Sequence, residues 1–341
     1  MKVLVYSARA YDQKFLRAAN HRKHELHFMG AQLEESTAAL ARQYPSVCCF
    51  VDDVLNKDVI KQLSDGGTRL IALRATGFNN VDLKAAKAAG ITVMRVATYS
   101  PYAVAEFAVG MMLDLDRKIH RAYTRVREGN FLLHGLMGFE LHGKTVGIIG
   151  TGKIGSGLAC ILKGFGCFLL AYDTIENPEC IKLGVRYVPL KELLNKADIV
   201  SLHLPLTPKT HYLINDENLS QMKKGAMLIN TSRGALVDTH ALLRALKKGH
   251  LGSVGLDVYE EESQIFYQDL SDEIIPDAMI TQLLTFPNVL VTGHQAFFTE
   301  EAMAVISETT IQNISDFAAG RENENILRPE KVFRASGKNK K

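Results

Sequence analysis

A histidine follows an apolar run near the end of the chain, in the segment VTGHQAFF that spans Val291 to Phe298. His294 comes directly after the run NVLVT, whose β-branched residues are typical of a strand. An imidazole suits proton transfer near neutral pH, because its ordinary pKa is about 6.5. A single histidine in such a place is more often a buried ring with satisfied hydrogen bonds, so the rest of the sequence has to decide its role.

Three glycines in the stretch GIIGTGKIG have the spacing G-x-G-x-x-G: Gly150, Gly152 and Gly155. The first two lack side chains, so the backbone can turn sharply and approach a pyrophosphate, and the third lets a helix pack closely on its strand. An apolar strand pattern precedes the glycines and an apolar helix pattern follows them, with the helix N-terminus available for phosphates. This context favours a dinucleotide site over a tight turn without a ligand.

A carboxylate ends the next predicted strand, because Asp173 stands 18 residues after Gly155. This is the position from which an acidic residue accepts hydrogen bonds from a ribose diol, although a strand-end cap is the simpler alternative. The following residues, TIEN, contain no arginine or lysine for a 2′-phosphate, and Glu176 would repel one. The sequence therefore predicts NAD rather than NADP.

Two further groups of charged residues follow predicted strands. Arg233 stands in LINTSRGALVD, and an arginine fork binds a substrate carboxylate through two parallel hydrogen bonds. Glu260, Glu261 and Glu262 follow GLDVY, and such a triplet is usually an acidic surface loop. Because parallel strands end at one edge of a sheet, we expect Arg233, one glutamate and His294 to lie close together.

The elements that must position these residues form two α/β series. Strand and helix patterns alternate over the first hundred residues, and six more strands follow residue 143. One continuous helix is predicted over residues 101–130, with Pro101 in its first turn and with Ile119 and Tyr123 extending its apolar face. A last helix begins at Thr299. The expected fold is α/β, with two Rossmann-like doubly wound parallel-sheet domains and an active-site cleft between them.

Composition limits the class of protein. The 341 residues carry a formal charge of +3, but the tail RASGKNKK holds four positive residues, which leaves −1 on the body and argues against nucleic acid. Apolar runs are too short for a membrane span. Five cysteines show no metal-ligand spacing, and their odd number favours reduced thiols. We therefore expect a soluble cytoplasmic protein with no metal and no membrane or nucleic-acid partner.

Nearly the whole chain resembles the D-isomer-specific 2-hydroxyacid dehydrogenases, most closely the bacterial fermentative D-lactate dehydrogenases. The matching stretches are ALRATGFNNVDL, YSPYAVAEFAVGMML, GKTVGIIGTGKIG, INTSRGALVD, GLDVYEEE and GHQAFFT. The resemblance implies an NAD-dependent enzyme that reduces pyruvate to D-lactate reversibly, working as a homodimer or dimer-based homo-oligomer. A larger 2-oxo acid, such as phenylpyruvate or a branched-chain one, is the first alternative. An NAD(H)-sensing scaffold similar to the corepressor relatives is the second.

The resemblance also assigns roles to residues. It makes Arg233 the substrate-binding arginine, Glu262 the partner of the histidine, and His294 the acid and base. The implied substrate contacts are Thr76, Gly77, Tyr99 and Phe297, and aromatic side chains such as Phe50 and Phe298 could limit substrate size. The implied cofactor contacts are Gly150, Gly152, Lys153, Ile154, Gly155, Asp173, Leu204, Pro205, Thr210, Thr231, Ser232, Arg233 and Asp257.

Two departures from the family pattern, Phe107 and Ser232, do not touch this chemistry. The family's chain path also implies a discontinuous domain division. Residues 1–99 and 298–341 form the predicted substrate-binding domain, and residues 100–297 form the predicted NAD-binding domain.

Overall fold

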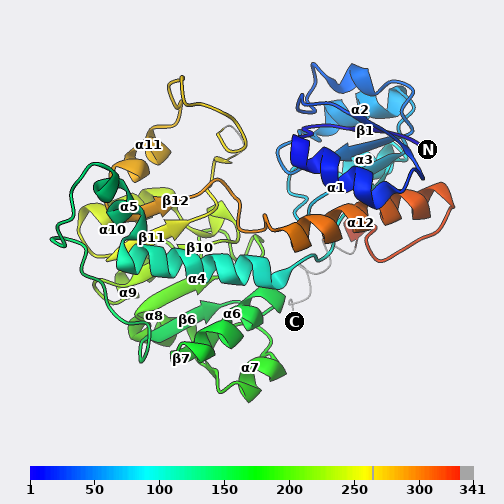
Figure 1. Cartoon of the computed structure of the whole chain (residues 1–341). Coiled ribbons are helices and arrows are strands. Elements are labelled where there is room, and N and C mark those ends of the chain that lie inside the picture. The colour runs from blue at the N-terminus through cyan, green and yellow to red at the C-terminus, as the bar shows by residue number, and fades with distance from the viewer. Residues whose placement is uncertain (263–264, 331–341) are drawn as a thin grey trace. The chain divides into compact units, whose positions relative to one another are not determined.

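The computed structural model describes residues 1–262 and 265–330 and shows two compact α/β units (Figure 1). Unit 1 consists of Met1–Ser100 together with the segment that begins at Phe298, and unit 2 consists of Pro101–Phe297. The basic tail RASGKNKK lies outside the described residues. Among the described residues, no helix is long and apolar enough to cross a membrane.

Unit 1 contains a five-stranded parallel sheet with the strand order β2-β1-β3-β4-β5. Its strands are β1 (Lys2–Val5), β2 (Glu25–Phe28), β3 (Ser46–Cys49), β4 (Leu70–Leu73) and β5 (Thr92–Met94). Its helices are α1 (Ala10–Asn20), α2 (Lys57–Asp65), α3 (Leu83–Ala88) and α12 (Glu300–Ala318), with a 3₁₀ turn at Ala38–Ala41.

The unit 1 sheet is buried on both faces, as parallel sheets usually are. Cys48 and Cys49 are adjacent in β3 and belong to two different hydrophobic clusters, one on each face. The cluster around Cys48 is completed by Ile311 and Ile314 of α12, which packs beside α1 (Figure 1). Thr299 starts that helix by accepting a 3.2 Å hydrogen bond from the Ala302 amide.

Unit 2 contains a seven-stranded parallel sheet with the order β12-β11-β10-β9-β6-β7-β8. Its strands are β6 (Thr145–Ile149), β7 (Phe168–Tyr172), β8 (Arg186–Tyr187), β9 (Ile199–Leu202), β10 (Met227–Asn230), β11 (Ser253–Leu256) and β12 (Val289–Val291). Its helices are α4 (Pro101–Arg117), α5 (Ile119–Arg127), α6 (Lys153–Gly164), α7 (Pro178–Lys182), α8 (Leu190–Lys196), α9 (Asp216–Gln221), α10 (Thr239–Lys247) and α11 (Ala278–Thr285), with a 3₁₀ turn at Gly234–Leu236.

Two helical layers cover this sheet. Side chains of α4 and α6 form one cluster with residues such as Leu169, and side chains of α8, α9 and α10 form the other with residues such as Leu170. Leu169 and Leu170 are neighbours in β7, so the alternation of the strand sends them to opposite layers. The predicted α/β class with doubly wound parallel sheets is confirmed.

The prediction of one continuous helix over residues 101–130 was wrong. Lys118 has a left-handed backbone, with φ of 52°, and separates α4 from α5. The Asp114 carboxylate accepts a 2.9 Å hydrogen bond from the His120 amide and lies 2.7 Å from His120 Nδ1. These two contacts stabilise the break between the helices. Ile119 and Tyr123 are therefore exposed, at 55% and 63%, and do not extend the buried face of α4.

Candidate active site

The three glycines connect β6 to α6, and the space around the Cβ position differs among them. Gly150 has φ of +96°, and a Cβ there would lie 2.5 Å from the His203 carbonyl oxygen. A Cβ on Gly155 would overlap the Gly150 carbonyl oxygen. A Cβ on Gly152 would meet nothing within 4 Å among the described residues. The fold thus requires the first and third glycines, and the second borders open space beside the α6 N-terminus.

This loop fits a dinucleotide phosphate. Gly152 is the N-cap of α6, and Lys153 and Ile154 supply the first amides of the helix. Amides at a helix N-terminus have no intrahelical partner and attract anions. With a glycine facing open space at that point, a pyrophosphate can approach the backbone without meeting a side chain.

Asp173 follows β7 and lies against the glycine loop. Its carboxylate accepts hydrogen bonds from the Thr151 amide, at 2.7 Å, and from the Thr174 amide, at 2.6 Å. Burial raises the pKa of Asp173, but hydrogen bonds from three backbone amides and the Thr151 hydroxyl outweigh burial, so the pKa lies below its ordinary value. An ionised carboxylate here is suited to accept hydrogen bonds from a ribose diol.

The predicted cofactor contacts Leu204, Pro205 and Thr210 lie in the loop after β9. The hydroxyl of Thr210 donates to the Pro205 carbonyl at 2.7 Å and accepts from the Thr207 amide at 2.8 Å. The hydrogen bonds of the Thr210 hydroxyl therefore stabilise the conformation of the loop. Leu204 lies beside the glycine loop, since its Cδ2 would be 2.9 Å from a Cβ on Gly150.

The turn after β10 fixes the backbone around Arg233. Asn230 Nδ2 donates to the Arg233 carbonyl at 2.8 Å, and Ser232 Oγ donates to the Leu202 carbonyl at 2.6 Å. The buried Thr231 hydroxyl has no hydrogen-bond partner among the described residues. The guanidinium of Arg233 donates to the Ser232 carbonyl at 2.6 Å. The other N–H groups of the guanidinium can donate hydrogen bonds to a substrate carboxylate.

Close backbone packing joins this turn to the loop that carries the glutamates. A Cβ on Gly234 would overlap the backbone of Tyr259, so the two loops touch at that point. β10, β11 and β12 are consecutive neighbours in the sheet, and all of them are parallel. Arg233, Glu262 and His294 therefore follow the carboxyl ends of three adjacent strands.

The three consecutive glutamates have three different environments. Glu260 accepts hydrogen bonds from the hydroxyls of Tyr212 and Thr239. Glu261 is exposed. Glu262 lies with Oε1 2.9 Å from His294 Nδ1, and its Oε2 accepts a 3.0 Å hydrogen bond from the Tyr259 amide. Of the three, Glu262 is the one that the described structure pairs with the histidine.

His294 is held in an unusual backbone conformation, with φ of 51°. Asp257 fixes the loop: its carboxylate accepts from the Thr292 hydroxyl at 2.6 Å and from the Gln295 and Ala296 amides at 2.9 Å each. Burial raises the pKa of Asp257. A strained backbone that its surroundings hold in place is a frequent property of functional sites.

Sequence reasoning missed two of the groups that position the pair. Tyr267 donates its hydroxyl to the His294 carbonyl at 3.0 Å, and Tyr259 contributes the amide that holds Glu262. Tyr259 stands in the matching stretch GLDVYEEE, but what it contributes is a backbone amide, which its residue type does not indicate, and Tyr267 stands in a loop without a recognisable motif. The structure shows that Asp257 positions the loop of His294. Its predicted contact with the cofactor stays a prediction.

The other predicted substrate contacts belong to two units. Thr76 and Gly77 follow β4 in unit 1, where the Thr76 carbonyl accepts a 2.9 Å hydrogen bond from Arg95. The buried Thr76 hydroxyl has no partner among the described residues. Tyr99 lies near the end of unit 1's first segment, and Phe297 is the last residue of unit 2. Their roles toward a substrate stay predictions.

Comparison with known proteins gives consistent matches over almost the whole chain. D-lactate dehydrogenase of Escherichia coli (strain K12) is 49% identical over 96% of this chain and 100% of its own length. Its apo-structure superposes with a TM-score of 0.88, covering 96% of this chain and 100% of that one at 48% identity. The structure titled pyruvate reductase of Chlamydomonas reinhardtii gives a TM-score of 0.91 at 46% identity, covering 95% and 98% of the two chains.

A further solved relative contains the cofactor. D-lactate dehydrogenase with NAD⁺ from Lactobacillus jensenii is 35% identical, with a TM-score of 0.80 over 96% of this chain and 100% of that chain. Residues 109–296 match the family described as D-isomer specific 2-hydroxyacid dehydrogenase, NAD binding domain. The chain therefore belongs to the D-isomer-specific 2-hydroxyacid dehydrogenase family and is an NAD-dependent dehydrogenase.

Proposed function

We propose that this dehydrogenase reduces pyruvate to D-lactate with NADH and also catalyses the reverse reaction. The observation that carries the proposal is the hydrogen-bonded pair of Glu262 and His294 beside the Arg233 turn. An acid/base group and a carboxylate-binding group at one sheet edge are what reduction of a 2-oxo acid requires. The relatives whose titles name D-lactate dehydrogenase and pyruvate reductase support pyruvate as the substrate.

In this mechanism His294 supplies the proton. Its Nδ1 faces Glu262, so Nε2 is the ring nitrogen that can donate to the carbonyl oxygen of the substrate. The Glu262 carboxylate stabilises the imidazolium, and the Tyr259 amide fixes the orientation of that carboxylate. In the reverse direction the same ring takes the proton from the hydroxyl of lactate.

Arg233 orients the substrate. Its planar fork binds a carboxylate through two parallel hydrogen bonds, and its charge offsets the negative charge that develops on the carbonyl oxygen. We propose that Thr76, Gly77 and Tyr99 also bind the substrate, and that Phe297 limits the size of its side chain. Such a limit on the size of the side chain favours the methyl group of pyruvate.

NAD fits the glycine loop, where Gly152 leaves room for the phosphates and Asp173 is ionised beside the loop. When bound, the cofactor supplies the hydride that reduces the carbonyl carbon. The residues of the chain contribute binding, orientation and the proton.

A panel of 2-oxo acids tests the proposal. The chain is assayed with NADH and with NADPH against pyruvate, phenylpyruvate and a branched-chain 2-oxo acid, and the product is analysed on a chiral column. We expect the highest kcat/KM for pyruvate with NADH, and D-lactate as product. A higher kcat/KM for a bulkier acid would shift the assignment to a different 2-hydroxyacid dehydrogenase. No NADH oxidation with any acid would favour the sensing scaffold.

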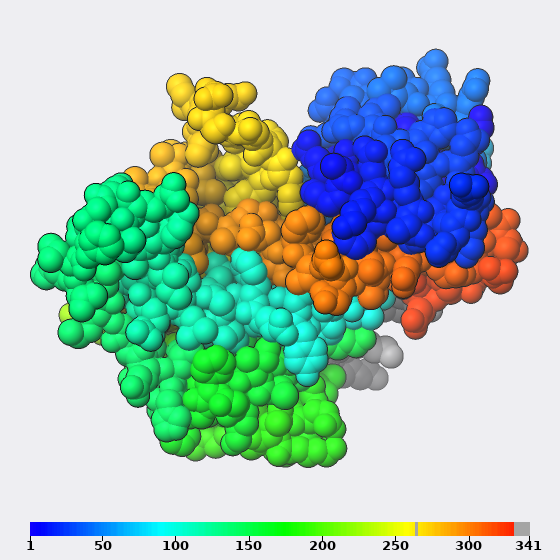
Figure 2. Space-filling model, viewed as in Figure 1, coloured from blue at the N-terminus to red at the C-terminus, as the bar shows by residue number. Residues whose placement is uncertain are grey.

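We propose further that the chain forms a homodimer through the surface of α5 and the loop after it. All α5 residues are at least partly exposed, and Figure 2 shows this segment on the surface of unit 2, in green at the left. The exposed apolar residues there are Ile119, Tyr123, Val126, Phe131, Leu132, Leu133 and Met137. Large exposed apolar patches mark interaction surfaces in soluble proteins, and a second copy is the occupant that the family resemblance implies.

The oligomeric state tests this surface directly. Light scattering at micromolar concentration should give the mass of a dimer for the parent chain. A Leu133→Glu/Met137→Glu variant should give a monomer, and a monomeric parent chain would contradict the proposal.

We also propose a cytoplasmic location, since all five cysteines are free thiols in the structure. Fractionation of expressing cells would check it.

A further inference from the structure

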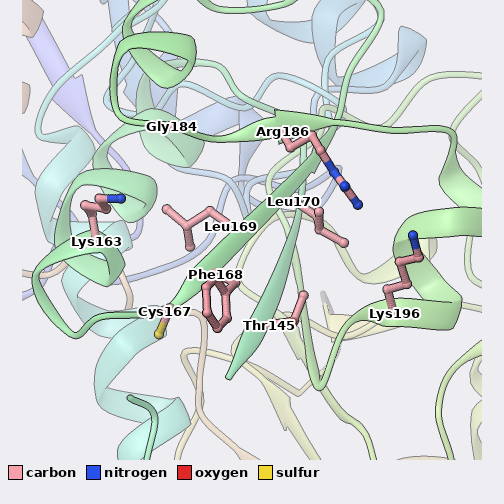
Figure 3. A pocket seen from close by; sticks show the side chains of 9 residues that line it. All are labelled: Thr145, Lys163, Cys167, Phe168, Leu169, Leu170, Gly184, Arg186 and Lys196. Atoms are coloured by element: carbon pink, nitrogen blue, oxygen red, sulfur yellow. The ribbon is translucent and has the colours of Figure 1, made fainter. Parts of the chain in front are cut away.

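A notch lies at the β8 edge of the unit 2 sheet, away from the glycine loop. It encloses about 350 Å³ and is lined by residues of β6, α6, β7, β8 and α8 (Figure 3). β8 pairs with β7 through Leu170 and Ala171, so Phe168 and Leu169 have no partner in β8. The notch is the space that this short edge strand leaves between the two helical layers.

The rim of the notch is strongly basic. Lys163 lies in the last turn of α6, Arg186 begins β8 and Lys196 ends α8. Figure 3 shows Lys163 on one side of β7 with Lys196 on the other. One carboxylate, Glu192, pairs with two of them, at 3.2 Å from Arg186 and 2.8 Å from Lys196. Two excess positive charges therefore face a cavity of small-molecule size.

Of the three cations on the rim, Lys163 is the one without an ion pair among the described residues. Its Nζ would lie 3.7 Å from a Cβ on Gly184, so the amine reaches toward the turn before β8. Asp198, two residues after Lys196, is already paired, because its carboxylate accepts from the Thr145 amide at 2.9 Å and pairs with Lys223 at 2.8 Å.

The wall of the notch is apolar and includes an aromatic ring. Phe168 is 67% exposed although its side chain is an apolar ring and the next three residues of β7 are buried, and Cys167, Leu169 and Leu170 line the same space. An exposed aromatic ring is a stacking platform for a planar base. The combination of stacking surface and cations matches a ligand that has both a flat ring and several negative charges.

We propose that this notch binds a nucleoside di- or triphosphate, with the base on Phe168 and the phosphates on Lys163, Arg186 and Lys196. Its volume falls within the range of small-molecule sites. A peptide strand is the poorer fit, because the free edge of β7 is shorter than a normal strand.

This site is distinct from the NAD site. The notch lies at the amino-terminal ends of β6, β7 and β8, whereas the glycine loop follows the carboxyl end of β6. The 12-residue helix α6 separates them, a length of roughly 18 Å at about 1.5 Å per residue. The proposal does not depend on which 2-oxo acid the enzyme reduces.

Calorimetric titration of ATP into the full chain, saturated with NADH to occupy the glycine loop, tests the proposal. We expect saturable ATP binding in the parent. The single variants Lys163→Gln and Arg186→Gln should each bind ATP about tenfold more weakly, because each removes a charge-assisted contact. Phe168→Ala should weaken ATP binding several-fold while leaving inorganic pyrophosphate binding unchanged. Lys247→Gln, an exposed lysine of α10, is the matched control and should bind ATP as the parent does.

Two results would overturn the proposal: no ATP binding to the NADH-saturated chain, or binding that the Lys163→Gln/Arg186→Gln double variant retains in full. Equal loss of ATP and pyrophosphate binding in Phe168→Ala would also contradict the stacking role. The substituted side chains are exposed, so thermal melts of the variants should match the parent and exclude misfolding as the cause.

Discussion

Glu262 Oε1 lies 2.9 Å from His294 Nδ1, although 32 residues separate the two along the chain. The sheet brings them together, because β11 and β12 are parallel neighbours and both residues follow the carboxyl ends of these strands. Both side chains are largely buried, with 19% of the histidine and 24% of the glutamate exposed. Partial burial strengthens their electrostatic interaction and leaves the ring accessible to a substrate.

Replacing the histidine tests the proton donor. His294→Ala should lower kcat for pyruvate reduction about 10²- to 10⁴-fold, the usual contribution of an acid/base group. The Kd for NADH, measured by fluorescence titration, should stay within a few-fold of the parent value because the glycine loop is untouched. Unchanged turnover would remove His294 from the mechanism.

The glutamate triplet offers a matched pair of variants. Glu262→Gln should reduce kcat at pH 7 by about tenfold or more, because a neutral amide stabilises an imidazolium less well than a carboxylate does. Glu261→Gln should leave kcat unchanged, since Glu261 is exposed. Steady-state assays of both variants check this, and the opposite order of effects would show that the wrong glutamate was chosen.

Arg233→Lys tests the recognition of the substrate carboxylate. A lysine keeps the charge but loses the two parallel hydrogen bonds, so the KM for pyruvate should rise about tenfold or more. Arg244→Lys is the control, because the exposed pair of Arg244 with Asp216 lies on α10 and α9. A KM for pyruvate that is equal in the two variants would count against the bidentate contact.

Two substitutions in the glycine loop distinguish an effect on NADH binding from an effect on folding stability. Gly152→Ala should weaken NADH binding at least tenfold while the melting temperature stays within a few degrees, since the added Cβ meets no described atom within 4 Å. Gly155→Ala should lower the melting temperature itself, because its Cβ overlaps the Gly150 carbonyl. Calorimetric binding and thermal melts of both variants provide the comparison.

His203 makes stability depend on pH. Burial lowers its pKa from 6.5 to about 4 in the folded chain. Between these values the unfolded state binds more protons, so stability is fully present above pH 6.5 and is lost as the pH falls toward 4. At pH 5 this loss is at most about 2 kcal/mol. The free energy of unfolding can be measured with urea at pH 7 and at pH 5, for the parent and for His203→Gln. It should decrease less from pH 7 to pH 5 in the variant than in the parent.

Much of this molecule could be predicted from local sequence. The alternating patterns and the G-x-G-x-x-G spacing predict the parallel sheets and the loop before α6, because both depend on the periodicity of nearby residues. Arg233 and His294 could be placed at strand ends for the same reason. Glu262 needed the family resemblance, since periodicity does not distinguish three adjacent glutamates.

Other features depend on contacts that local sequence does not encode. β8 has two residues, too few to show a period, so the seventh strand was not predicted. The break at Lys118 contains no glycine or proline, and Asp114 stabilises it from the previous helix. The role of Asp257 in holding Gln295 and Ala296 arises from tertiary structure, across 38 and 39 residues of chain.

The return of α12 to unit 1 has a consequence for biosynthesis. Ile311 and Ile314 complete the core that Val3 and Val5 begin, so the amino-terminal unit lacks part of its interior until the ribosome has passed residue 318. Unit 2 is continuous in sequence and is fully translated earlier. The part of unit 1 before residue 101 therefore leaves the ribosome ahead of unit 2 but reaches its native packing after it.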